Sequence, residues 1–322
     1  MISCKEFNQK NYIVKYYLVT EWQDIINISI NNKDCFFRGQ SDASWGLVTS
    51  LERAGGMSSH GEMSTLLECM RGGTNYLESP VPGFQDYYEW LCIMQHYGAP
   101  TRLLDVSRSA FIALFFAICD LQTDNDACLW CFNPALSFHR FYNDISEVYG
   151  KGQPDFTPTF MENETVGIAL ANAYIDKSNN INNINFPEKL KIKREEVIKR
   201  HSQGGILILP PQRQTKRSLA QQGEFLFPIN LEMTFEQNLL GMIGQATSSK
   251  HFDFVENNFS PYVSRYSGVY PFLVEKYIIP HALRHKFLYE LKHMNISYKT
   301  LFPDIYGFMK DIEPKAKILK KW

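Results

Sequence analysis

The side chains that could do chemistry are concentrated between Gln95 and Asp105, where the chain reads Gln-His-Tyr-Gly-Ala-Pro-Thr-Arg-Leu-Leu-Asp. His96, Arg102 and Asp105 could act as a general base, a phosphate clamp and a carboxylate that orients the histidine or a metal, which is the equipment for phosphodiester cleavage. A metal-dependent nuclease generally needs several converging carboxylates, and Asp105 has no acidic neighbour in the motif, so we predict no metal site. A purely structural alternative is that Arg102 and Asp105 pair with each other.

A second group of polar residues follows an apolar strand predicted over 35–40, which ends in Arg38, Gly39 and Gln40. Gly39 allows the backbone to turn or a ligand to approach closely. An arginine with a buried base needs a partner, and a phosphate or carboxylate in a pocket would supply one. The structural alternative is a salt bridge to a neighbouring residue.

A third group lies at the start of a later aromatic strand, where Gln222 and Glu224 bracket a glycine. If both belong to the strand, residues two apart point to the same face. The basic segment 213–217 precedes them and could bind a phosphate. The sequence therefore places polar groups at the ends of two predicted strands and in the stretch from Gln95 to Asp105.

The elements around the stretch from Gln95 to Asp105 are predicted as two helices. Apolar residues at helical spacing predict a helix over 86–97, with Asp86 and Glu89 in the form of a capping box. Gly98 suits the left-handed position that ends a helix, and Pro100 cannot continue it. The segment 109–119 is apolar at nearly every position, which predicts a helix buried on all sides.

The remaining segments predict an α+β fold. Buried strands are expected over 127–132, 204–209 and 273–279, and a core helix over 283–294. The polar region at about 138–203 has weak periodicity and is predicted to be a surface insertion. We therefore expect one main domain over 1–322, with a mixed or split antiparallel sheet and flanking helices.

Composition places the chain among ordinary globular proteins, because its 322 residues are 44% hydrophobic and 21% charged. A formal net charge of −1 predicts no global attraction to nucleic acid or to an anionic membrane. No apolar window reaches membrane-spanning length and the N-terminus does not read as a signal peptide, so a cytoplasmic location is expected. The seven cysteines are expected to be thiols, and Cys128 and Cys131 to face opposite sides of a strand rather than to bind zinc.

Taken together, the motifs resemble the FRG-domain family of bacterial and phage proteins. The residues that carry the resemblance are Phe37-Arg38-Gly39-Gln40, the stretch from Gln95 to Asp105, Ala220-Gln221-Gln222-Gly223 and Leu301-Phe302-Pro303-Asp304. The family usually reads Leu-Leu-Asp-Trp-Thr where this chain has Val106 and Ser107 after Asp105, so an indole is absent and a hydroxyl is kept.

At the level of pattern, the order of these motifs also resembles the ADP-ribosyltransferase superfamily. That resemblance implies that a nicotinamide dinucleotide, NAD, is the substrate, for ADP-ribosyl transfer or glycohydrolysis by a toxin or phage-defence effector. Arg38 would neutralise a pyrophosphate oxygen, the hydroxyls of Tyr97 and Thr101 would orient the ribose or nicotinamide, and Glu224 would stabilise an oxocarbenium-like transition state. Gln222 would position the acceptor, left open between a protein and a nucleic acid.

The candidate residues follow from these hypotheses. The candidate catalytic residues are Glu224, Gln222, Arg38 and His96. The residues expected to contact the dinucleotide are Arg38, Gly39, Gln40, Tyr97, Thr101, Arg102 and Asp105. The alternatives are a nuclease that acts through His96, Arg102 and Asp105, and a non-catalytic module that recognises a nucleotide or another phosphorylated small molecule.

Overall fold

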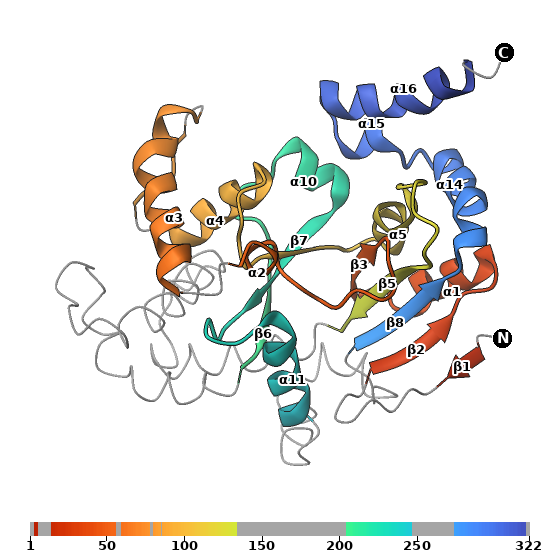
Figure 1. Ribbon diagram of the computed structural model, residues 1–322, viewed down its shortest axis with the longest axis horizontal. Coiled ribbons are helices and arrows are strands. Elements are labelled where there is room, and N and C mark those ends of the chain that lie inside the picture. The colour runs from red at the N-terminus through yellow and green to blue at the C-terminus, as the bar shows by residue number, and fades with distance from the viewer. Residues whose placement is uncertain are drawn as a thin grey trace.

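The fold is an eight-stranded mixed sheet with helices on both of its faces (Figure 1). The structure, a computed structural model, describes residues 3–5, 14–55, 59–77, 80–84, 86–133, 204–246 and 274–319. The region 138–203, expected to be an insertion, lies outside the described residues. The strands are β1 (Ser3–Lys5), β2 (Val14–Leu18), β3 (Phe36–Gln40), β4 (Leu104–Ser107), β5 (Ala127–Phe132), β6 (Ile206–Leu209), β7 (Gly223–Pro228) and β8 (Val274–Ile279).

The helices are shorter segments between these strands and after them. The first half of the chain contributes α1 (Trp22–Asn31), α2 (Ser50–Arg53), α3 (Ser59–Gly72), the 3-10 helix η1 (Gly73–Asn75), α4 (Tyr87–His96) and α5 (Ala110–Ile118). The second half contributes α10 (Lys216–Gln221), α11 (Phe235–Ala246), the 3-10 helix η2 (His281–Leu283), α14 (Arg284–His293), α15 (Tyr298–Leu301) and α16 (Ile305–Leu319). Among the described helices, none combines the length and apolar character needed to cross a lipid bilayer.

The strands run in the order β1-β2-β8-β5-β3-β4-β7-β6, and only β2 and β8 are paired in parallel. The prediction of an α+β fold with a mixed sheet is therefore confirmed. The centre of the sheet is its weakest point, because β3 and β4 are joined through one residue pair, Phe37 and Ser107. By contrast, β3 pairs with β5 from Phe36 to Gln40, and β4 pairs with β7 from Leu104 to Ser107. Two half-sheets thus meet at a narrow join.

One face of the sheet is covered by helices along most of its width. Helices α1, α5 and α14 pack against β3, β5 and β8, and helices α3 and α4 pack against β6 and β7. The opposite face carries α11 and the loop 41–49 over a separate apolar cluster that includes Phe36, Val106, Trp130 and Leu226. We call this second surface the α11 face.

Helix α5 is the apolar helix predicted from the sequence, and it lies directly against β3. The Oγ atom of Ser109 accepts a hydrogen bond from the backbone N–H of Ile112 (3.3 Å) and caps its first turn. A Cβ atom on Gly39 would lie 1.9 Å from the carbonyl oxygen of Ala113. The close approach of α5 to the sheet therefore requires glycine at position 39.

Helix α4 ends as predicted, but the Asp86 side chain makes no capping hydrogen bond at its start. Gly98 has a φ of 83°, which glycine adopts without strain. The predicted capping box at Asp86 is wrong, because Asp86 Oδ2 accepts a hydrogen bond from the backbone N–H of Gly83 (2.8 Å) instead. The Glu89 carboxylate is used elsewhere, since its Oε1 lies 2.5 Å from Nε of Arg213. Asp86 and Glu89 therefore bind Gly83 and Arg213, respectively, in place of the two contacts that a capping box would make.

The two cysteines of the C-x-x-C motif lie on opposite faces of β5, as predicted. Cys128 belongs to the apolar cluster of the α11 face, whereas Cys131 packs beneath α5. Burial raises the pKa of the Cys128 thiol to about 11, so the group is protonated at neutral pH. Within the described residues, no three His, Cys, Asp or Glu side chains gather as metal ligands would.

Candidate functional site

Arg38 projects from the centre of β3 toward the α11 face, beside the join between the half-sheets. It is half-buried, and its Nη1 donates to the backbone carbonyl of Asp105 (2.7 Å) across the join. Burial lowers the pKa of Arg38 and the nearby Arg53 lowers it further, while Asp105 opposes both effects. Its Nε atom is buried and has no hydrogen-bond partner in the described part of the chain. Within the described residues, Arg38 therefore has one unpaired donor, which is buried next to the join.

Glu224 lies on β7, and its carboxylate is almost completely buried. Arg108 binds it through both Nε and Nη2, and the side-chain exposures are 62% for Arg108 and 7% for Glu224. The Arg108 guanidinium also lies over the Phe36 ring, 5.2 Å from its centroid. Burial raises the pKa of Glu224, and the charge of Arg108 counteracts this by favouring the ionised carboxylate. The pair thus joins a buried anion to a cation that reaches solvent.

Arg38 and Glu224 share the α11 face of the sheet. The antiparallel pair of Phe37 and Ser107 places Val106 beside Arg38, and Val106 is paired in turn with Glu224. Directly opposed residues of neighbouring strands project to the same face. The two strands that carry Arg38 and Glu224 are separated by one strand, which corresponds to about 10 Å. The structure therefore brings these two predicted residues to one side of the join.

Asp105 and Thr101 form a separate polar group with Gln95. The Gln95 Nε2 atom donates to Asp105 Oδ2 (2.7 Å), and the Thr101 hydroxyl donates to Gln95 Oε1. Thr101 is completely buried, and its backbone N–H donates to Oγ of Ser50 (3.0 Å). Thr101 thus fixes the turn after α4. The side chain of Asp105 is exposed and faces away from Arg38, because successive residues of β4 point to opposite faces and Val106 lies beside Arg38.

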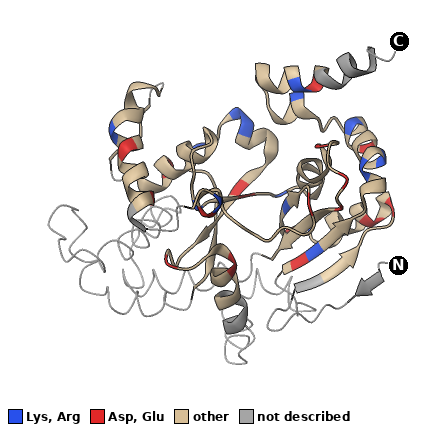
Figure 2. Ribbon diagram, viewed as in Figure 1, with Lys and Arg blue, Asp and Glu red and all other residues tan. Residues whose placement is uncertain are grey.

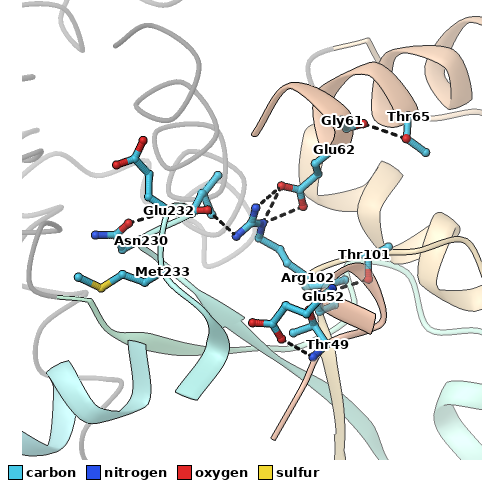
Figure 3. A network of polar contacts seen from close by, with 12 residues as sticks. Thr49, Glu52, Gly61, Glu62, Thr65, Thr101, Arg102, Asn230, Glu232 and Met233 are labelled. Atoms are coloured by element: carbon cyan, nitrogen blue, oxygen red, sulfur yellow. Dashed lines mark hydrogen bonds and ion pairs between the residues drawn. The ribbon is translucent and has the colours of Figure 1, made fainter. Parts of the chain in front are cut away.

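Arg102 is buried inside the protein and pairs with Glu62 of α3 (Figure 3). Its Nε lies 2.8 Å from Oε1 and 2.7 Å from Oε2 of Glu62, and its Nη2 lies 2.6 Å from Oε2. The proposed pairing of Arg102 with Asp105 is therefore wrong, because a carboxylate on another helix satisfies the guanidinium. A nuclease that uses Arg102 as its phosphate clamp gains no support, since Arg102 is 2% exposed and already paired.

Gly39 and Gln40, which were expected to contact the dinucleotide, are occupied by contacts within the protein. The space beside Gly39 is filled by α5, as described above. Gln40 Nε2 donates to the carbonyl of Gly46 (2.9 Å), and its Oε1 accepts from the Trp130 indole N–H (2.6 Å). Gln40 therefore holds the loop that follows β3.

His96 and Tyr97 lie at the C-terminal end of α4, on the face opposite to Arg38. Their rings meet edge to face at 5.0 Å, and Tyr97 is exposed. Burial and the neighbouring Arg217 lower the pKa of His96, and Asp304 opposes them. The second and last family-like motifs, around His96 and Asp304, thus approach each other, but Arg38 and Glu224 are not part of this group.

Gln222 lies outside the strand that carries Glu224. It has a φ of 47° and caps α10, and β7 begins only at Gly223. Its backbone carbonyl accepts a hydrogen bond from the N–H of Arg108 (3.0 Å). The expectation that Gln222 and Glu224 point to the same face of one strand is wrong, because Gln222 is the left-handed residue that caps α10 and the strand begins after it.

The sequence did not single out Arg53 and Arg108, which lie near Arg38 and Glu224. Arg108 directly follows the strand β4, and alternation along that strand could have placed it with Val106. Arg53 ends the four-residue helix α2, and its Nη1 donates to the carbonyl of Val48 (2.7 Å). In the view of Figure 2, Lys and Arg residues are dispersed over many elements, so local geometry and not a basic surface defines this group.

A comparison with protein families identifies an FRG domain at residues 33–126. The match contains Arg38, Asp105 and Arg108 but not Glu224. The comparisons with curated proteins and with solved structures gave no match. The similarity to the FRG domain therefore covers residues 33–126, which is less than half of the chain.

Proposed function

We propose that the protein binds a nicotinamide dinucleotide on the α11 face, across the join between β3 and β4, and cleaves its nicotinamide glycosidic bond. The observation that carries the proposal is the placement of Arg38 and Glu224 on the same face, on either side of that join. An arginine for the pyrophosphate and a carboxylate for the reacting sugar are the charges that this reaction needs.

The guanidinium groups near the join support the phosphate half of the proposal. Arg38 has a buried Nε without a partner in the described residues, and Arg53 is close enough to lower the pKa of Arg38. Arg108 is largely exposed and can turn its donors toward a ligand. Like charges held near one another gain most from a dianion such as pyrophosphate, which their planar forks can bind through paired hydrogen bonds.

The position of Glu224 supports the chemical half. In the reaction, the bond between C1′ of the ribose and the nicotinamide nitrogen breaks, and nicotinamide leaves with the electron pair as a neutral molecule. Water or an acceptor group then forms the new bond to C1′ and releases a proton to solvent. Positive charge develops at the sugar before the new bond is complete, and a buried carboxylate stabilises it strongly because little water screens the interaction.

A second candidate function is recognition of a phosphorylated ligand without catalysis. The ion pair between Arg108 and Glu224 favours it, since a carboxylate that is neutralised by arginine also serves to hold a phosphate-binding guanidinium in position. Both functions use Arg38, but only the enzyme requires Glu224 in the reaction itself.

The test is to incubate the protein with labelled dinucleotide and to measure released nicotinamide, with and without Glu224→Gln. We expect turnover to fall on the order of 100-fold or more while dinucleotide affinity changes little. Glu68→Gln, at an exposed position of α3, is the matched control. A folded Glu224→Gln protein with parental turnover would exclude the proposed role of Glu224 in the reaction, and binding without any release by the parent protein would favour recognition.

A further inference from the structure

The loop that follows β3 is held in place through its backbone. The N–H of Ala43 donates to the carbonyl of Asp126 (2.7 Å), and the carbonyl of Gly46 accepts from Gln40 Nε2 (2.9 Å). The N–H of Leu47 donates to Glu236 Oε1 of α11 (3.0 Å). A Cβ atom on Gly46 would lie 2.3 Å from that same Oε1 atom. The loop is therefore fixed at several successive residues.

Two buried cations hold the same loop. Lys276 Nζ donates to the carbonyls of Ala43 (2.7 Å) and Trp45 (3.5 Å) and lies 4.4 Å from the centroid of the Trp130 ring. Arg284 is fully buried and donates to the carbonyl of Ser41. A buried cation is costly unless it is hydrogen-bonded, so these contacts favour one arrangement of the loop strongly over others.

Trp45 is exposed on this rigid loop. The residue is 54% exposed even though its backbone carbonyl is bound by Lys276. A large aromatic surface on a fixed backbone loses little conformational freedom when it binds a ligand. Indole rings stack well on planar heterocycles, including nucleobases.

The part of the loop that contains Ala43 and Trp45 lies on the α11 face, on the side of Arg38 that is away from Glu224. Lys276 is paired with Trp130 of β5, and Trp130 is paired with Arg38 of β3. Across the sheet the order is thus Lys276 with the Trp45 loop, then Arg38, then Glu224. A dinucleotide has its groups in a corresponding order, with adenine at one end, the pyrophosphate in the middle and the nicotinamide riboside at the other end.

We propose that Trp45 is the stacking platform for the adenine ring of the ligand. The inference rests on the proposed function for the direction in which the dinucleotide lies, because Glu224 must be near the nicotinamide riboside and Arg38 near the pyrophosphate. Adenine then lies at the Trp45 loop. Lys276 is a positioning residue that holds the platform without touching the ligand.

The experiment is a titration of the full chain with two fragments of the dinucleotide, ADP-ribose and nicotinamide mononucleotide, followed by calorimetry. We expect Trp45→Ala to weaken ADP-ribose binding about tenfold or more and to leave nicotinamide mononucleotide binding unchanged, because only the first fragment contains adenine. Trp45→Phe keeps an aromatic surface and should retain most of the affinity. Tyr76→Ala, at a residue that is 89% exposed elsewhere on the protein, is the control.

Lys276→Met tests whether Lys276 holds the platform in place. Like Trp45→Ala, it should weaken the binding of ADP-ribose and leave the affinity for nicotinamide mononucleotide unchanged. Absence of ADP-ribose binding by the parent, or equal effects of Trp45→Ala on both fragments, overturns the inference. The proposed catalysis is tested separately. If ADP-ribose binding depends on Trp45 but no nicotinamide is released, the platform is supported and catalysis is excluded. If nicotinamide is released and Trp45→Ala has no effect on ADP-ribose binding, catalysis is supported and the platform is excluded.

Discussion

The Arg102 guanidinium meets the Glu62 carboxylate inside the protein, with both Nε and Nη2 within 2.8 Å of its oxygens. The pair connects the turn after α4 to helix α3. Because both groups are almost fully buried, removal of either charge leaves the other without compensation. This contact therefore belongs to the stability of the domain and not to its chemistry.

We expect Glu62→Gln to lower the free energy of unfolding by about 3–5 kcal/mol, since it leaves the Arg102 charge buried and unpaired. Urea denaturation measures the change. Glu68→Gln on the same helix is exposed and should alter stability by less than about 0.5 kcal/mol. Equal stabilities of the two variants would contradict the structural role of the buried pair.

Gly39→Ala should destabilise the domain by about 1–3 kcal/mol or more, because the added methyl group collides with the backbone of α5. Gly72→Ala is a matched control, since nothing lies within 4 Å of a Cβ at that position. Thermal unfolding of both variants provides the comparison. A Gly39→Ala protein as stable as Gly72→Ala would mean that α5 does not press on β3 as described.

Arg38→Lys should weaken binding of the dinucleotide by about tenfold with a small loss of stability. Lysine keeps the positive charge but loses the planar fork that can bind two phosphate oxygens at once. Titration of the folded variant with dinucleotide measures the affinity, and Arg71→Lys on the exposed side of α3 is the control. Unchanged affinity would remove Arg38 from the ligand site.

Arg108→Gln should change the pH dependence of turnover. Burial raises the pKa of Glu224, and Arg108 partly offsets that rise. The active form needs the ionised carboxylate, so activity is present above the pKa of Glu224 and is lost as the pH falls through it. Removal of Arg108 raises this pKa further, and the acidic limb of the rate profile should move to higher pH. A limb that stays in place, or moves to lower pH, would show that Arg108 does not set the charge state of Glu224.

Local patterns in the sequence predicted the helices and strands well, because the formation of a helix or strand depends largely on residues that are close together in the chain. The apolar run that forms α5 and the glycine that ends α4 are examples, and the strands β3, β5, β6 and β8 also lie within their predicted ranges. The partners of charged residues were harder to predict. Arg102 pairs with a carboxylate that lies 40 positions away in the chain, and no local spacing connects them.

The candidate site was predicted only in part, because its geometry depends on contacts between residues that are far apart in the sequence. A pattern of strands could place Arg38 and Glu224 at strand positions, but their common face follows from the order of β3, β4 and β7 in the sheet. Gly39 shows a different limit, since a missing side chain suits a close ligand and a close helix equally well. The arrangement of α5 decides between them.

The join between β3 and β4 also has a consequence for how the domain opens. The ladder between the two strands contains one residue pair, Phe37 and Ser107, and Arg38 adds a side-chain hydrogen bond to the Asp105 carbonyl, whereas the ladders on either side are longer. Separation of the half-sheets at this point would break the fewest interstrand hydrogen bonds, and both flanking ladders would survive it. Amide protons next to the join should therefore exchange with solvent through a local opening, at a lower free energy than those in the middle of β5. The candidate site would then lie where the sheet opens most easily. A ligand that contacts both half-sheets would raise the free energy of this opening.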